Sequence, residues 1–256
     1  MHFGGIFLKY KFKIFAILIC TYIYIVSINY IASSYKNMGG VSILQTNNYV
    51  GRLESKKVYL TFDDGPSNSI TLKILNILKE SNVKATFFVV GSQIKNRENI
   101  IKKIYSDGNG IGLHSYSHIY KKVYRSSDSF IDEMNKTARE VHNVIGINPK
   151  AIRFPAGSKK HLNKKLASRL HDLGYKIFDW NISADDGFNN NIAATKIYKN
   201  SIANKEKFTR AIITLHCSEE NKETVKALPR IIKHYKDAGY VFMIINKDTH
   251  EYYFKY

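Results

Sequence analysis

The chain has 256 residues, of which 44% are hydrophobic, so it is long enough for one large domain with a substantial core and an additional tail. Its formal net charge of +18 would suit a nucleic acid or a polyanionic surface such as a bacterial cell wall. The charges are spread along the chain rather than gathered in blocks, which weighs against a nucleic-acid-binding protein. The two cysteines, Cys20 and Cys217, lie in very different contexts and imply no disulfide framework.

The N-terminal region has the pattern of a membrane anchor. Residues 1–13 contain Lys9, Lys11 and Lys13 but no acid, and residues 14–35 contain no charged side chain. About 20 apolar residues span a bilayer as a helix, and basic residues favour the cytoplasmic side. We therefore expect a cytoplasmic basic tail at 1–13, a transmembrane helix at 14–35 and an extracellular remainder. A cleaved signal peptide followed by secretion is the alternative, although its apolar core would usually be shorter.

Residues 36–56 are polar and irregular and predict a linker, after which residues 57–256 form the predicted domain. Strand-like and helix-like segments alternate through this domain. Strands are expected at 57–62, 84–90, 110–113, 150–154, 175–180, 210–216 and 240–245. Helices are expected at 69–81, 93–107, 128–146, 161–173, 191–203 and 222–238. This alternation predicts an α/β fold with about seven parallel strands. The length is slightly short for an eight-fold barrel, so we expect a distorted, incomplete (β/α) barrel, with a doubly wound open sheet as the alternative.

Polar side chains follow five of the predicted strands. The first strand ends in Asp63 and Asp64, followed by a Gly-Pro turn. Two adjacent carboxylates are costly to hold unless a metal, an arginine or a shared proton neutralises them. The other strand ends carry these polar residues: His114 and His118, Arg153, Asp179 beside Trp180, and His216. Catalytic groups of parallel α/β proteins gather at the carboxyl ends of the strands, so the sequence predicts an active site there.

The spacing of two histidines indicates a metal site. His114 and His118 are four residues apart, so on one helical turn both imidazoles would point the same way. With Asp64 they supply two nitrogen ligands and one oxygen ligand and leave positions open. This donor set suits a catalytic zinc, and also cobalt, manganese, iron or nickel.

Two further residues have expected partners. Arg153 follows an apolar strand, where its charge requires a carboxylate, and Asp63 is the candidate. A Cys217–His216 dyad is disfavoured because adjacent strand residues face opposite sides.

Five segments, taken in order, resemble the motifs of the polysaccharide deacetylases, also called the NodB homology domain or carbohydrate esterase family four. They are Thr-Phe-Asp-Asp-Gly, His-Ser-Tyr-Ser-His, Arg-Phe-Pro-Ala-Gly, Asp-Trp and Leu-His, and the resemblance covers roughly residues 55–246. It implies a distorted (β/α) barrel that removes acetyl groups from N-acetylated sugars with a divalent metal, often zinc.

The resemblance also implies roles for single residues. Asp63 is similar to the catalytic base of the family and His216 to the catalytic acid, while Arg153 would tune Asp63 and Asp179 would orient a catalytic partner. The implied metal ligands are Asp64, His114 and His118. The implied substrate pocket includes Pro155, Ala156, Trp180 and Leu215. The chain departs from the family pattern at Ala156, Thr214 and Cys217, which affects the pocket and the surroundings of His216.

An outward-facing, basic domain suits a polymer outside the membrane, so the expected substrate is N-acetylglucosamine of peptidoglycan. One alternative is a deacetylase of a chitin-like oligosaccharide or an exopolysaccharide, or another amide hydrolase of the same superfamily. A protein that binds the cell wall without catalysis is the less expected alternative.

Overall fold

The computed structural model describes residues 21–23, 25–29, 55–187, 192–203 and 207–255. The chain divides into two compact units, Met1–Leu53 and Glu54–Tyr256. In the first unit, residues 21–23 and 25–29 are helical. No helix within the described ranges is long and apolar enough to cross a membrane. The predicted tail at 1–13, most of the predicted span at 14–35 and nearly all of the linker at 36–56 lie outside the described residues.

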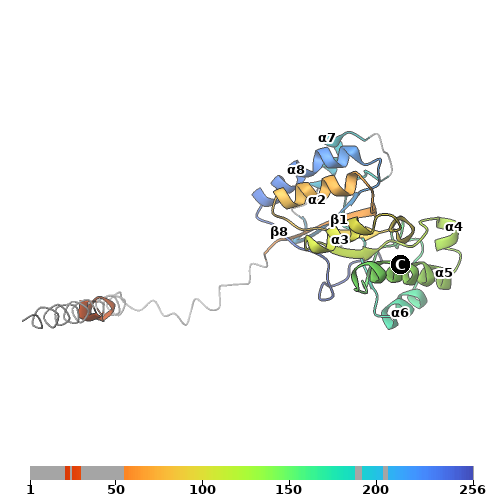
Figure 1. Ribbon diagram of the computed structural model, residues 1–256, viewed down its shortest axis with the longest axis horizontal. Coiled ribbons are helices and arrows are strands. Elements are labelled where there is room, and N and C mark those ends of the chain that lie inside the picture. Colours follow the sequence, from red (N-terminus) through yellow and green to blue (C-terminus); the bar gives the residue numbers. More distant parts are fainter. Residues whose placement is uncertain (1–20, 24, 30–54, 188–191, 204–206, 256) are drawn as a thin grey trace, which may run out of the picture. The chain divides into compact units, whose positions relative to one another are not determined.

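The second unit is built on a parallel sheet in which β1 pairs with β2, β7 and β8 (Figure 1). The strand order is β5-β4-β3-β2-β1-β7-β6, and β8 pairs with the start of β1. The strands are β1 Lys57–Gly65, β2 Thr86–Val89, β3 Gly110–Leu113, β4 Ala151–Ile152, β5 Lys176–Ile177, β6 Ile182–Ser183, β7 Arg210–His216 and β8 Val241–Phe242. Every pair of neighbours is parallel, as the alternating pattern predicts.

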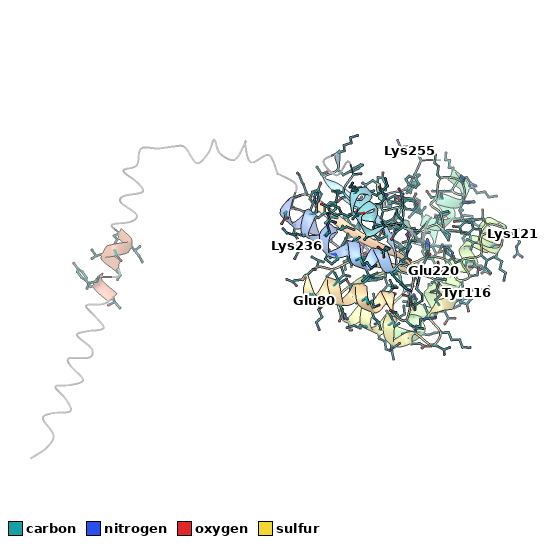
Figure 2. The ribbon with its side chains drawn as sticks, turned by 90° about the horizontal axis from the view of Figure 1, so that it is seen from above. Glu80, Tyr116, Lys121, Glu220, Lys236 and Lys255 are labelled. Carbon is teal, nitrogen blue, oxygen red and sulfur yellow. The ribbon has the colours of Figure 1, made fainter. Side chains whose placement is uncertain are left out.

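The helices lie between the strands in the chain. They are α2 Ile70–Glu80, α3 Glu98–Ser106, α4 Tyr120–Val123, α5 Ser127–Ile145, α6 Lys164–Asp172, α7 Ala194–Ser201 and α8 Lys222–Asp237, with a short 3-10 turn, η2, at Gly91–Gln93. Lys121 of α4 and Lys236 of α8 lie at opposite ends of the unit (Figure 2). The ammonium of Lys236 donates a hydrogen bond to the carbonyl of Ser81. Ser81 lies between the end of α2 and the start of β2, so Lys236 marks the end of the unit at which the strands begin.

Two separate hydrophobic clusters show how the sheet is covered. The larger cluster contains the buried faces of the helices together with one face of the strands, for example Phe62, Leu78 and Ile231. The smaller cluster contains Tyr59, Phe88, Phe178, Ile212 and Ile245, none of which belongs to a helix. Helices therefore cover one face, and the other face closes on itself. This is the incomplete (β/α) barrel that the sequence predicts, rather than a doubly wound sheet with helices on both faces.

The strand ends differ from the predicted ones in ways that matter for the site. Strand β1 continues through Asp63 to Gly65 rather than ending at Phe62, because β7 pairs with it as far as Asp63 and His216. The two-residue strand β6 and the short helix α4 were not predicted, since neither is long enough to show a hydrophobic period. Helix α5 ends at Gly146 with φ of 72°, the left-handed conformation that glycine favours.

Candidate active site

A β-bulge places the two adjacent carboxylates at one mouth of the barrel. Asp63 pairs with Phe88 of β2, but the next pair is Gly65 with Val89, so Asp64 is an extra residue. Its φ is 68°. Side chains of consecutive strand residues normally point to opposite faces, and a bulge re-aims one of them. As a result, the Nε2 atom of His114 lies 4.0 Å from Asp63 Oδ2 and 3.5 Å from Asp64 Oδ1.

The two histidines converge through a loop rather than through the helical turn that their spacing suggested. Residues 114–119 form no helix, and Ser115 and His118 have positive φ values of 64° and 54°. Glu133 of α5, which sequence reasoning missed, holds this loop. Its carboxylate accepts hydrogen bonds from the backbone N–H groups of Tyr116 at 2.9 Å and Ser117 at 2.6 Å. The loop is therefore tied to the longest helix of the described chain.

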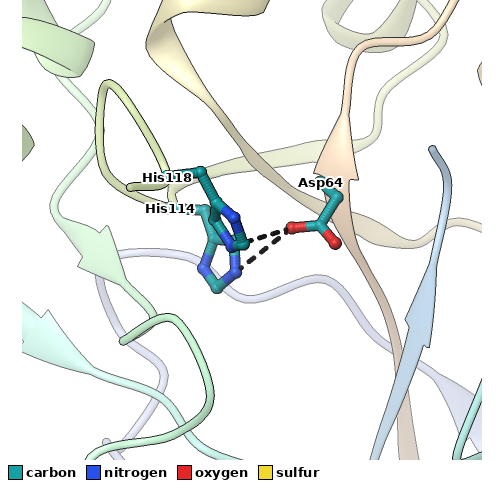
Figure 3. Close-up of side chains that lie close together, drawn as sticks. All are labelled: Asp64, His114 and His118. Carbon is teal, nitrogen blue, oxygen red and sulfur yellow. Dashed lines mark ion pairs between the residues drawn. The ribbon is translucent and has the colours of Figure 1, made fainter. Parts of the chain in front are cut away.

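Asp64, His114 and His118 fit a divalent metal. Their candidate ligand atoms all lie within 4.8 Å of one another (Figure 3). Asp64 Oδ1 is 3.2 Å from His118 Nε2, and it is buried without a hydrogen-bond partner. A buried carboxylate oxygen of this kind requires a cation or a donor. The set leaves coordination positions open, as catalytic zinc sites do.

His114 is prepared as a neutral ligand. Its Nδ1–H donates to the carbonyl of Arg153 at 2.9 Å, which leaves the Nε2 lone pair facing Asp64. Burial lowers the pKa of His114 despite the two nearby aspartates, so the ring is neutral at pH 7. A neutral imidazole is the form that binds a metal.

Asp63 forms the ion pair that the sequence predicts. The fully buried Arg153 donates through Nη1 to Asp63 Oδ1 at 2.9 Å and to Thr61 Oγ1 at 2.6 Å, and through Nε to the carbonyl of Phe178 at 2.8 Å. Burial alone would raise the pKa of Asp63, but Arg153 and two nearby histidines hold that pKa below its usual value. Asp63 is therefore an ionised carboxylate beside the proposed metal ligands.

His216 has a partner that sequence reasoning missed. Its Nδ1 lies 2.9 Å from Asp186 Oδ1, and its backbone N–H donates to Asp186 Oδ2 at 2.9 Å. Thr224 donates to the same Oδ2 at 2.6 Å. Burial would lower the pKa of His216, but the hydrogen bond and charge of Asp186 raise it to about 9. The segment Ala-Asp-Asp-Gly at 184–187 carries an acidic pair before glycine, like the end of β1, and could have signalled this residue.

Asp179 does not contact His216 or the metal ligands. Its carboxylate accepts hydrogen bonds from Ser158 N at 3.0 Å and Phe254 N at 2.8 Å. Only its backbone carbonyl reaches a catalytic candidate, accepting from Arg153 Nη2 at 3.2 Å. Asp179 thus fixes the segment after β4 and the C-terminal segment, while Asp186 fills the orienting position at His216.

The groups surround a cavity of about 110 Å³. It is lined by Asp63, Asp64, His114, His118, Tyr120, Ala156, Trp180, Ser183, Gly187, Thr214 and His216. The predicted pocket residues Ala156 and Trp180 are among them, but Pro155 and Leu215 are not. Leu215 packs in the larger core cluster, because Thr214 and His216 on either side of it face the cavity. Pro155 is buried, and its carbonyl accepts a hydrogen bond from Tyr124.

Cys217, the third position at which the chain departs from the family pattern, does not line the cavity and packs in the larger core cluster. Its Sγ contacts the carbonyl of Asp63 at 3.2 Å, and burial raises the pKa of the thiol well above its usual value. The structure therefore agrees with the prediction that Cys217 and His216 form no catalytic dyad.

Neighbouring strands thus present a carboxylate that stays ionised and an imidazole that stays protonated at neutral pH. Asp63 and His216 pair directly in the register of β1 and β7. Two groups whose pKa values are pushed apart by their surroundings are suited to act as a general base and a general acid. With a divalent metal held by the adjacent three residues, this arrangement suits hydrolysis of an amide or ester.

Comparison with known proteins gives a consistent result. Residues 51–178 match the family described as polysaccharide deacetylase. A peptidoglycan-N-acetylglucosamine deacetylase of Bacillus cereus is 34% identical over 201 residues, covering 77% of this chain and 72% of that protein. A peptidoglycan-N-acetylmuramic acid deacetylase of Bacillus subtilis is 32% identical and covers 77% and 73% of the two chains.

Solved structures are similar in fold. The crystal structure of a polysaccharide deacetylase from Bacillus cereus superposes with a TM-score of 0.70 at 32% identity, covering 76% of this chain and 94% of that chain. The catalytic domain of a peptidoglycan N-acetylglucosamine deacetylase from Eubacterium rectale gives 0.69 at 28% identity, with 77% and 92% covered.

Proposed function

The chain belongs to the polysaccharide deacetylase family and is thus a hydrolase of carbon–nitrogen bonds other than peptide bonds, and we propose that it removes N-acetyl groups from N-acetylglucosamine in peptidoglycan. The observation that carries this proposal is the placement of Asp64, His114 and His118 beside the ionised Asp63 and the protonated His216. Similarity to relatives named for peptidoglycan supports the choice of polymer.

The proposed metal site has a defined task. A divalent metal held by Asp64, His114 and His118 would polarise the acetyl carbonyl and make water acidic enough to react near neutral pH. Asp63 would accept the proton of the attacking water, since it is ionised and its Oδ2 lies 4.0 Å from Nε2 of the proposed metal ligand His114. Arg153 would keep Asp63 ionised and oriented through the 2.9 Å ion pair.

The leaving amine needs a proton, and His216 is the proposed donor. Asp186 keeps this imidazole protonated, with a pKa of about 9, and fixes its orientation through Nδ1 so that Nε2 carries the transferable proton. Backbone N–H groups near Ala156 are the proposed donors to the oxyanion that forms on the acetyl carbonyl. Ala156 lines the cavity with φ of 62°, an unfavourable conformation of the kind that clusters at functional sites.

We also propose that the domain acts outside the cell, held by a helix formed by residues 14–35. The support is the uncharged run of the sequence and the lysines that precede it. The full-length chain should fractionate with membranes, whereas a variant lacking residues 1–35 should not. Recovery of the full-length chain in the soluble fraction of washed cells would contradict this part of the proposal.

The decisive experiment is digestion of peptidoglycan with and without the purified full-length protein, followed by mass mapping of the released muropeptides. Loss of one acetyl mass on N-acetylglucosamine is expected with zinc or another divalent metal present, and no loss after chelation. Loss on N-acetylmuramic acid would assign the other sugar of the polymer. Acetate release that continues unchanged in His114→Ala would overturn the proposed metal site.

A further inference from the structure

The catalytic cavity is too small to enclose a sugar chain. Its volume is about 110 Å³, whereas pockets that enclose a whole small ligand measure roughly 300–1,000 Å³. A cavity of this size suits the acetamido group and part of the ring that bears it. If the chain is a glycan deacetylase, as proposed above, the neighbouring saccharides must lie against the surface around the mouth of this cavity.

An exposed aromatic residue, Tyr120, occupies that surface. Tyr120 lines the cavity and is 49% exposed, and the preceding Ile119 is 47% exposed. Both come directly after His118 in the chain. The other exposed large hydrophobic residues in the described part of the second unit are Tyr105, Leu173 and Val241, and none of them lines the cavity. Exposed apolar groups at the rim of a polar site mark a binding surface.

The ring of Tyr120 is held in place before any ligand arrives. It meets the His118 ring edge-on at a centroid distance of 5.7 Å and the Tyr124 ring at 6.1 Å. Tyr124 in turn stacks on His161 at 3.5 Å and donates to the carbonyl of Pro155 at 2.6 Å. Tyr120 is thus supported by His118 and Tyr124, and through Tyr124 by the segment after β4. A preorganised aromatic ring loses little conformational entropy when it binds.

The chemistry of the ring fits a pyranose. The face of an aromatic ring carries negative electrostatic potential, and it attracts the weakly positive C–H groups that line one face of a sugar ring. We propose that Tyr120, with Ile119 beside it, binds the saccharide next to the one that is deacetylated. The protein would then act on sugars within a chain in preference to single N-acetylated sugars.

The test compares Tyr120→Leu and Tyr120→Phe with wild type on the monomer and the hexamer of N-acetylglucosamine. The wild type is expected to have a much higher kcat/KM for the hexamer. Tyr120→Leu should reduce the hexamer-to-monomer ratio of kcat/KM by about tenfold, whereas Tyr120→Phe should keep most of it. Tyr105→Leu is the matched control, because Tyr105 has a similar exposure of 47% but lies on α3 and does not line the cavity. It should leave the ratio unchanged.

A second measurement separates saccharide binding from an effect through His118. Binding of the hexamer is measured by calorimetry in the Asp63→Asn background, and zinc affinity is measured for each variant. About tenfold weaker hexamer binding by Tyr120→Leu, with unchanged zinc affinity, supports the inference. Equal losses on monomer and hexamer together with weaker zinc binding would overturn it, as would unchanged hexamer binding. Absence of acetate release from every oligomer and from peptidoglycan by the wild type would instead refute the proposed function.

Discussion

Replacement of Asp186 by asparagine tests the proposed acid most directly. Asparagine keeps the size of the side chain and one hydrogen-bond acceptor but removes the negative charge that faces His216. In the wild type burial lowers the pKa of His216, but Asp186, with smaller contributions from Asp63 and Asp64, raises it from 6.5 to about 9. At about 1.4 kcal/mol for each pKa unit, the protonated imidazole is favoured by roughly 3 kcal/mol. Without the charge of Asp186, burial lowers the pKa of His216 and is opposed mainly by the smaller contributions of Asp63 and Asp64, so the pKa should fall.

The assay is the pH dependence of kcat/KM with the metal saturating. The wild type should keep its activity up to an alkaline limb near pH 9, where His216 loses its proton. In Asp186→Asn this limb should move from about pH 9 toward 6.5, the ordinary pKa of histidine. If the limb reaches pH 6.5, only about a tenth of the imidazole is protonated at pH 7.5, so kcat/KM should fall by up to about tenfold there.

The neighbouring Asp185 gives a matched control. It is exposed, and its carboxylate accepts a hydrogen bond from Ser183 rather than from His216. Its φ of 61° is a conformation that asparagine also tolerates. Asp185→Asn should therefore leave the alkaline limb where it is. An alkaline limb that stays near pH 9 in Asp186→Asn would refute the assignment of His216 as the acid maintained by Asp186.

The same pair predicts a pH dependence of stability. Because the pKa of His216 is higher in the folded state than in the unfolded state, its contribution is fully present below about pH 6.5 and is lost as the pH rises toward 9. Urea unfolding of the wild type across this range should show the loss, and Asp186→Asn should show little of it.

Three further substitutions test other parts of the site. Asp63→Asn should abolish acetate release while zinc affinity stays within about twofold, and a large loss of zinc affinity would mean that Asp63 is itself a ligand. Arg153→Met leaves the buried carboxylate of Asp63 without its cation, so urea unfolding should show about 3–5 kcal/mol lower stability; a loss below 1 kcal/mol would contradict the importance of this pair. Gly187→Ala would place a methyl group against the ring of His216, so kcat should fall at least tenfold with little change in stability, and unchanged kcat would show that the ring can move aside.

The sequence predicted the parallel α/β fold and most of the residues that the structure brings together in the candidate site, because both depend on strong local signals. Apolar runs such as the one ending at Phe62 are long enough to identify strands, and polar residues at their ends are conspicuous. Arg153 and Asp63 could be paired by charge alone, since a buried guanidinium requires an acid.

What the sequence did not predict depends on short or irregular backbone. Asp186 follows a strand of two residues and lies 30 positions from His216, so no local pattern connects them. Leu215 was assigned to the pocket by resemblance, whereas the alternation along β7 turns it into the core. The histidine loop could not be placed either, because its shape depends on hydrogen bonds from Glu133.

The bulge at Asp64 restricts that position in a way that ligand chemistry alone does not. A glutamate would also offer a carboxylate to a metal, but position 64 has φ of 68°, a conformation in which aspartate and asparagine are several-fold enriched among non-glycine residues. Asparagine would satisfy the backbone and lose the charge, and glutamate would keep the charge and strain the backbone. Aspartate is the residue that meets both requirements, so the identity of this proposed ligand is selected by the main chain as much as by metal chemistry.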